Sequence, residues 1–159
     1  MKKGSLVALK QSAKQANQTE NIIYEKSFTV EGKTFKHAGK VSTQVKAILQ
    51  NMNYPIDKVR RAAIVTYEAE INICSYAEKG TITLRLTPGK IIIDVTDKGQ
   101  GIADINLAMK EGYSTATRRI WQMGFGAGMG LSNMKNYSDA FDISSEAGIG
   151  TNVKMVINV

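Results

Sequence analysis

Two short stretches hold the residues best suited to chemistry: DKGQGI at 97–102 and GFGAGMGL at 124–131. The first places the carboxylate of Asp97 directly before a glycine-rich turn, and the second has glycine at every other position. Glycine lets the backbone turn tightly and approach a flat ligand closely. The N–H groups of a glycine loop that leads into a helix form a site for anions. Together, the two stretches predict two sides of a nucleotide pocket.

Each stretch also has a simpler interpretation. Turns that contain Asp are common, and a glycine run can form a flexible lid that binds no ligand. The run at 124–130 is not a P-loop, because no Gly-Lys-Ser/Thr follows it, and no βαβ unit surrounds it as a dinucleotide fingerprint requires. Because so many glycines stand immediately before a predicted helix, we favour a lid that closes over phosphates.

A further pair, Glu68 and Asn72, lies in the segment YEAEINI. Residues four apart share a helix face, whereas Glu70 points elsewhere. An amide oxygen is a neutral ligand that suits Mg²⁺, and a carboxylate can accept a proton from a hydroxyl or water. An ordinary surface pair has the same spacing, so this pair identifies a site only together with the two glycine stretches.

The hydrophobic pattern predicts the first elements that position these residues. We expect a strand over 22–32 and a helix over 40–52. A long helix is predicted to begin at Pro55 and to end at Gly80, with Asp57 in its first turn. Its predicted apolar face consists of Ile56, Val59, Ala63, Ile64, Tyr67, Ile71 and Cys74.

The second half of the chain predicts a sheet interrupted by a lid. Strands are expected over 81–88 and 90–97, and the second, nearly all apolar, is expected to be central. A short helix over 104–110, a lid over 111–130, a helix over 131–137 and a closing hairpin of 140–148 with 150–159 follow. This order predicts an α+β fold, a two-layer sandwich in which helices cover one face of a mixed sheet.

Composition and charge limit the class of protein. The 159 residues carry a net charge of +7, and residues 1–50 hold nine lysines against three glutamates. These lysines are spread out without arginine, so we expect a solvated face rather than a nucleic-acid site. We predict a weakly ordered basic tail over 1–20 and a single ATP-binding domain over 21–159. One cysteine and no apolar run of about 18 residues predict a cytoplasmic protein without a membrane segment.

The motifs, taken in order, resemble the four boxes of the gyrase, Hsp90, histidine kinase and MutL ATPase superfamily. They are Glu-x-x-x-Asn at 68–72, Asp-x-Gly-x-Gly at 97–101, the glycine-rich lid at 126–131 that ends Gly-x-Gly-Leu, and Gly-Thr at 150–151. Each box is weak alone, but the set covers about residues 30–159 in the right order. Within the superfamily the chain looks most like bacterial anti-sigma factors and switch-type serine/threonine kinases.

The resemblance implies a Bergerat-type sandwich that binds ATP with Mg²⁺. It implies that Glu68 is the base that polarises the attacking hydroxyl, that Asn72 binds Mg²⁺, and that Asp97 reads the adenine amine. Thr151 is expected on the adenine side, and the lid is expected over the phosphates. The full set of implied nucleotide-binding residues is Asn72, Asp97, Gly99, Gly101, Ile102, Gly126, Gly128, Met129, Gly130, Leu131 and Thr151.

The resemblance also implies partners. Such kinases phosphorylate a serine or threonine of a small STAS-domain antagonist; some hold a sigma factor, and others control a phosphatase. A homodimer is compatible with the family. The alternative is a binding module in which ATP only sets the conformation. The lid's Arg118 and Arg119 can offset phosphoryl charge or be ordinary surface residues, and Trp121 can anchor a partner or cover the nucleotide.

Overall fold

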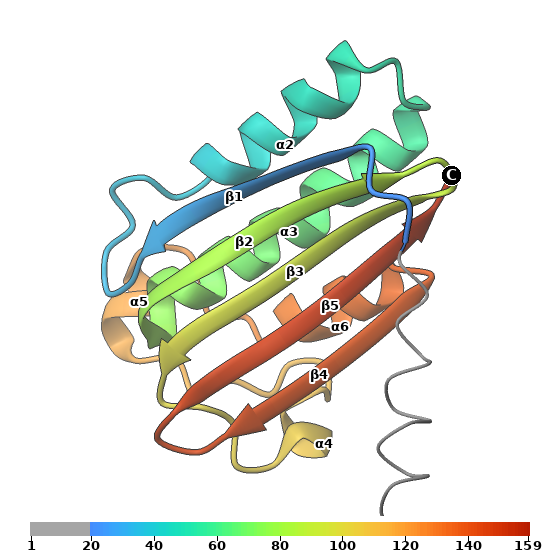
Figure 1. Ribbon diagram of the computed structural model, residues 1–159. Helices are drawn as coiled ribbons and strands as arrows, with labels where there is room; N and C mark the ends of the chain where they lie inside the picture. The colour runs from blue at the N-terminus through green and yellow to red at the C-terminus, as the bar shows by residue number, and fades with distance from the viewer. Residues whose placement is uncertain (1–19) are drawn as a thin grey trace, which may run out of the picture.

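Five strands form one sheet, with helices packed on one of its faces (Figure 1). The computed structural model describes residues 20–159, so the predicted basic tail lies, apart from Glu20, outside the described residues. In spatial order the strands are β1 (Tyr24–Glu31), β2 (Ala77–Thr87), β3 (Lys90–Gly99), β5 (Gly150–Asn158) and β4 (Ala140–Glu146). The α+β sandwich with a central β3 is therefore confirmed.

The prediction of a mixed sheet is wrong in one respect, because every neighbouring pair is antiparallel. Strands β3 and β4 do run parallel to each other, since both are antiparallel to β5, but β5 lies between them. The hairpin formed by β4 and β5 places the last strand of the chain beside β3. The long connection over 100–139 therefore spans a strand instead of creating a parallel pair.

The helices are α2 (Lys40–Asn51), α3 (Ile56–Tyr76), α4 (Ile105–Ala108), α5 (Arg118–Gln122) and α6 (Gly130–Asn136). Strand side chains that face α2, α3 and α6 are apolar, and Ile82, Leu84, Ile91 and Ile93 are fully buried. Because successive side chains in a strand point to opposite faces, every second residue meets the helices. This alternation buries one face of the sheet under the helices.

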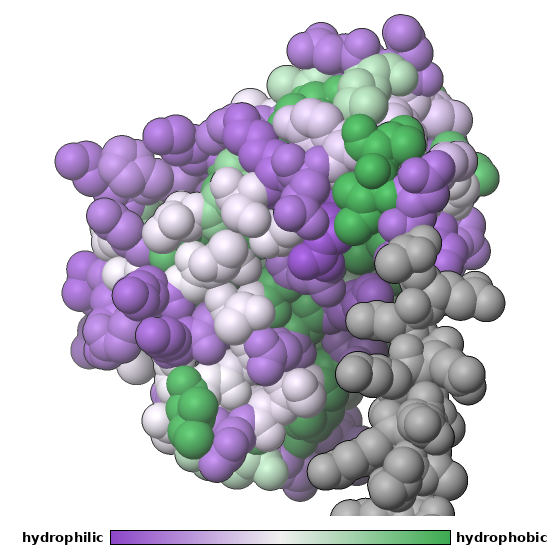
Figure 2. Space-filling model, viewed as in Figure 1, coloured by the Kyte–Doolittle hydropathy of each residue, from purple (hydrophilic) through white to green (hydrophobic). Residues whose placement is uncertain are grey.

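The other face of the sheet is polar. One row of facing residues crosses all five strands, and each member is an exposed hydroxyl or amide side chain. Figure 2 views this face and shows pale, weakly polar side chains at its centre. The row consists of Thr29, Thr81, Thr96, Asn152 and Ser144. The cavity that contains the predicted site residues lies on the helical side.

Helix α3 is the spine of the helical layer, and two details of its prediction are wrong. The chain passes directly from Tyr76 into β2 at Ala77, so the helix ends before Gly80, which belongs to the sheet. Ile56 and Tyr67, both assigned to the apolar face, are 73% and 38% exposed. The fully buried positions instead follow α-helical spacing against the sheet, and they include Val59, Ala62, Val65 and Ile73.

A buried carboxylate joins α3 to α2. Glu70 is only 1% exposed, and its two oxygens accept hydrogen bonds from the backbone N–H groups of Val41 at 3.0 Å and Ser42 at 3.2 Å. Helix α2 follows Gly39, which has no side chain to cap it. The Glu70 carboxylate therefore satisfies two of the unpaired N–H groups at this helix start, where negative charge is favoured.

Replacing Glu70 tests this contact. We expect Glu70→Ala to lower the free energy of unfolding by about 2–3 kcal/mol, because two buried N–H groups lose a charged acceptor. Chemical denaturation measures the change, and Glu111→Ala, at an exposed lid position, is the control. Equal stabilities of the two variants would contradict the anchoring role.

Candidate nucleotide site

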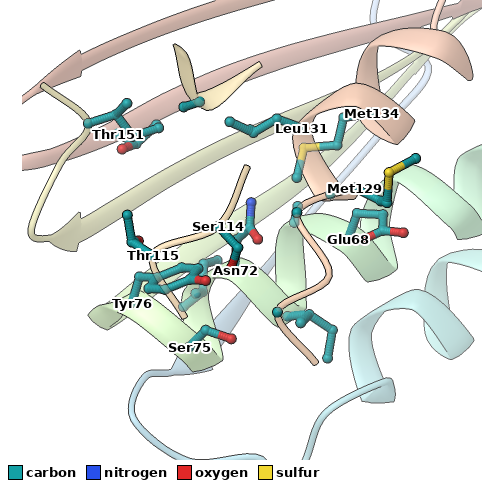
Figure 3. Close-up of a pocket in the computed structure, with 18 of the residues that line it drawn as sticks. Glu68, Asn72, Ser75, Tyr76, Ser114, Thr115, Met129, Leu131, Met134 and Thr151 are labelled. Carbon is teal, nitrogen blue, oxygen red and sulfur yellow. The ribbon is translucent and has the colours of Figure 1, made fainter. Parts of the chain in front are cut away.

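A cavity of about 680 Å³ opens between α3, the end of β3, the start of β5 and the 100–131 segment (Figure 3). This volume lies within the range of about 300–1,000 Å³ typical of small-molecule sites. Helix α3 supplies one wall through side chains on a single helix face. These residues are Glu68, Asn72, Ser75 and Tyr76, at spacings of four, three and one.

Asp97, near the end of β3, forms the opposite polar corner with the start of β5. Its Oδ1 accepts the backbone N–H of Thr151 at 3.3 Å. Burial raises the pKa of Asp97 above its ordinary value, and the hydrogen bond from Thr151 partly offsets that rise. Among the described residues no hydrogen bond is formed by Oδ2. This carboxylate therefore has a free acceptor beside the cavity.

A hydroxyl network holds this corner together, and its centre is Ser145. The Ser145 Oγ donates to the carbonyl of Gly150 at 2.9 Å and accepts the N–H of Ile102 at 2.8 Å. It also lies 2.8 Å from the Thr151 hydroxyl. Since a serine has only one O–H, Thr151 must donate in the last contact. The Thr151 oxygen then keeps lone pairs as acceptors.

The glycines of the lid allow close backbone approaches. Gly128 has a φ of +75°, and a Cβ there would overlap the carbonyl of Tyr113. The Gly112 N–H also donates to the carbonyl of Gly128 at 3.1 Å, which ties the two ends of the lid together. At Gly130, a Cβ would lie 3.3 Å from Asn72 Oδ1 and 3.4 Å from Glu68 Oε2. The lid therefore ends directly against the Glu68 and Asn72 pair.

The lid is also docked onto the loop between β1 and α2. The rings of Phe35 and Phe125 stack with centroids 4.8 Å apart and planes 15° apart. Between the two fixed ends lies α5, whose first turn is capped by the Thr117 side chain. The segment predicted as an irregular lid thus contains one short helix and one aromatic contact.

The structure brings together nearly all of the predicted site residues around this cavity. Lining it are Glu68, Asn72, Asp97, Gly101, Ile102, Gly126, Gly128, Met129, Gly130, Leu131 and Thr151. Gly99 does not line it: this residue packs where a Cβ would lie 2.9 Å from the carbonyl of Tyr76. Its role is to let β3 approach the junction of α3 and β2. Arg118, Arg119 and Trp121 are exposed and also lie outside the lining.

Several residues of the site were missed by sequence reasoning. Ser145 and Asn133 act through hydrogen bonds between segments far apart in the chain, and local spacing carries no signal for such contacts. Phe35 stands in a loop without periodicity.

Comparison with known proteins agrees with this geometry. Residues 57–159 match the family described as histidine kinase-, DNA gyrase B-, and HSP90-like ATPase. The chain belongs to this ATPase family. The family resemblance seen in the four motifs is thus confirmed, and the domain is one that binds ATP.

Individual proteins of known name are also similar to this chain. The chain is 32% identical over 118 residues to an anti-sigma F factor of Caldanaerobacter subterraneus subsp. tengcongensis, covering 71% of this chain and 79% of that protein. It is 34% identical over 104 residues to the serine/threonine-protein kinase RsbT of Bacillus subtilis, covering 62% and 72%. In a crystal structure of the SiaB-SiaC complex from Pseudomonas aeruginosa, a matching chain shares the fold. It has a TM-score of 0.61 and 13% identity, with 96% of this chain and 100% of that chain covered.

The cavity fits the nucleotide that the family binds. Polar groups stand at two of its sides, with Asp97 and Thr151 at one and Asn72 at the other, and the glycine-rich lid lies along a third. Within residues 20–159, no cluster of three or more His, Cys, Asp or Glu side chains could hold a metal ion. Mg²⁺ commonly takes one or two protein ligands and completes its shell with phosphate oxygens and water. In the same described part of the chain, no helix is long and apolar enough to span a bilayer.

We predict that the stack of Phe35 on Phe125 holds the lid in place. We expect Phe125→Ala to increase amide hydrogen exchange across 111–129 by about two- to tenfold, because an aromatic pair contributes about 0.5–1.5 kcal/mol. Phe35→Ala should have the same effect, although Phe35 lies outside the lid. Mass spectrometry of lid peptides measures the exchange, and Trp121→Ala is the control. An unchanged lid in Phe35→Ala would show that the stack does not hold it.

Proposed function

We propose that this ATPase-family chain is a switch-type protein kinase that transfers the γ-phosphoryl group of ATP to a serine or threonine. The observation that supports this most directly is the placement of Glu68 and Asn72 side by side on α3, facing the cavity and the end of the lid. A carboxylate there can act as a base. The relatives named as anti-sigma F factor and as a serine/threonine kinase support the same reading.

In the proposed reaction the acceptor hydroxyl oxygen forms a bond to the γ-phosphorus, and the bond from that phosphorus to the ADP oxygen breaks. The Glu68 carboxylate accepts the hydroxyl proton. Asn72 would hold Mg²⁺ through its amide oxygen, and the ion would neutralise charge on the phosphate oxygens. Phosphoryl transfer depends mainly on positioning and charge stabilisation, and a rigid helix face supplies the positioning.

The remaining residues bind the nucleotide in this proposal. Asp97 accepts a hydrogen bond from the adenine amine, with Thr151 as a second acceptor at the same corner. Gly101 and Ile102 line the base pocket. The lid binds the phosphates through backbone N–H groups and encloses them; its contributing residues are Gly126, Gly128, Met129, Gly130 and Leu131.

The proposed protein substrate is a STAS-type antagonist, with a sigma factor or a phosphatase regulator as the bound target. Exposed apolar side chains on the lid support a protein partner at this end of the molecule, since Trp121 is 55% exposed and Met123 is 51% exposed. The same surface would serve the alternative function, an ATP-gated binding module without turnover. We favour the kinase over the binding module, because a module that only binds ATP has no need of a base at Glu68.

Glu68→Gln separates the two functions. We expect it to lower the rate of phosphoryl transfer about 10²–10⁴-fold while ATP affinity stays within about twofold, because a general base contributes a factor of this size to a rate and acts after binding. Intact-mass analysis with Mg-ATP and the STAS-domain proteins of the source genome measures transfer. Glu31→Gln, exposed at the last residue of the edge strand β1 and outside the cavity lining, is the matched control. Transfer at the normal rate by Glu68→Gln would rule out the base assignment.

We expect Asp97→Asn to raise the stability of the folded protein and to lower its affinity for ATP. An acid whose pKa is raised by folding makes the folded state bind its proton more tightly, so ionisation at neutral pH reduces stability. This loss develops from about pH 3.9, the ordinary Asp value, upward through the raised pKa. Asparagine keeps the acceptor for Thr151 N–H but carries no charge.

The variant should therefore unfold at a higher temperature than the parent at pH 7 without nucleotide, and the difference should vanish below about pH 3.9, where both residues are neutral. ATP affinity, measured by calorimetry, should fall about tenfold because an amide is a weaker acceptor than a carboxylate. Asp142→Asn, exposed on β4, is the control. Unchanged ATP affinity would contradict the adenine-reading role.

A further inference from the structure

Glu68 has a partner that no motif contains. The side-chain amide of Asn133, on α6, donates a hydrogen bond from Nδ2 to Glu68 Oε1 at 2.8 Å. Both residues are half-buried, so water competes only in part for this contact. The bond joins the proposed base on α3 to the helix that follows the lid.

The direction of the Asn133 side chain is fixed by its neighbours on α6. Met134 is 1% exposed in the core and Ser132 donates through Oγ to the carbonyl of Met129 at 3.0 Å. At the far end of the helix, Arg61 of α3 donates from Nε to the carbonyl of Tyr137 at 2.9 Å. The same guanidinium pairs with Asp139 at 2.9 Å. Because Met134 packs in the core and Arg61 binds the end of α6, Asn133 is presented to Glu68 from a rigid element.

The bond makes the two oxygens of Glu68 different. Oε1 is occupied by the Asn133 donor, whereas Oε2 lies beside Gly130, where the lid ends. We propose that Asn133 is a positioning residue for Glu68: it holds the carboxylate by Oε1 and leaves Oε2 to accept the proton of the acceptor hydroxyl. This inference rests on the proposed kinase function.

The position of Asn133 also links the base to the lid. Helix α6 begins at Gly130, immediately after the lid, and Asn133 lies one turn further on the same helix face. A displacement of the lid's end that shifts the first turn of α6 lengthens the bond to Glu68. The carboxylate is therefore correctly aimed only when the end of the lid is in the position seen here.

Three substitutions at this position test the proposal. Asn133→Asp keeps the shape but places a carboxylate against Glu68, Asn133→Leu removes the donor at similar size, and Asn133→Gln keeps an amide. We expect kcat for phosphoryl transfer to fall about 10- to 100-fold in the first two, as for other small misplacements of a reacting group. The KM for ATP and the ATP affinity should stay within about twofold, since neither is set by the base.

The control is Asn136→Asp, which makes the same chemical change at an exposed position of the same helix. It should retain the parent kcat. Asn133→Gln should be faster than Asn133→Leu, because it retains a donor. In a Glu68→Gln background, Asn133→Leu should cause no further loss of rate, since the carboxylate that it positions is gone.

The possible results are distinguishable. A parent-like kcat in both Asn133→Asp and Asn133→Leu, with transfer by the parent protein intact, overturns this inference alone. An equal loss of ATP affinity and kcat in these variants also overturns it, because the role would then be structural. Absence of transfer by the parent protein, with every STAS protein tested, overturns the kinase proposal and this inference together.

Discussion

The buried carboxylate of Glu70 is the constraint on which the geometry of the helical layer depends. Residues two apart on an α-helix point in nearly opposite directions, so the contact of Glu70 with the start of α2 fixes the rotation of α3 about its axis. That rotation turns Glu68 toward the cavity and α6. One acid therefore fixes the orientation of Glu68, the residue that we propose as the base.

Two polar side chains of the site, Asp97 and Thr151, keep acceptor atoms without a hydrogen-bond partner among the described residues. Among residues 20–159 no buried side-chain nitrogen or oxygen lacks a hydrogen-bond partner, yet Asp97 uses one oxygen and Thr151 keeps its lone pairs. Burial of an ionised carboxylate opposes folding unless it is well paired. This cost at Asp97 agrees with the proposed role of the corner in binding a ligand.

Sequence reasoning succeeded where local pattern carries the information. Glycine spacing, the Glu68 and Asn72 pair and the alternation of the strands are local, and they predicted the family, the layers and a set of residues that share one cavity. The apolar face of α3 was misplaced, because Ile56 and Tyr67 fit a helical stripe by type but the sheet packs against another side. The pairing of β5 with β3 was missed because a sequence gives no direct information on the order of strands. Likewise, no local feature predicts that Asn133 meets a residue 65 positions earlier.

The long connection between β3 and α6 is fastened at two places that belong to the rigid body: the Asp97 corner before it and the buried Met134 after it. The entropy needed to close a loop rises slowly with its length, by about 0.6 kcal/mol for each doubling. The mostly exposed segment over 117–123 can therefore change in length while the sheet, α3 and Glu68 remain in place. In the proposed kinase, the partner-binding surface and the base thus lie in separate parts of the chain, and new specificities can arise by insertion rather than by redesign of the core.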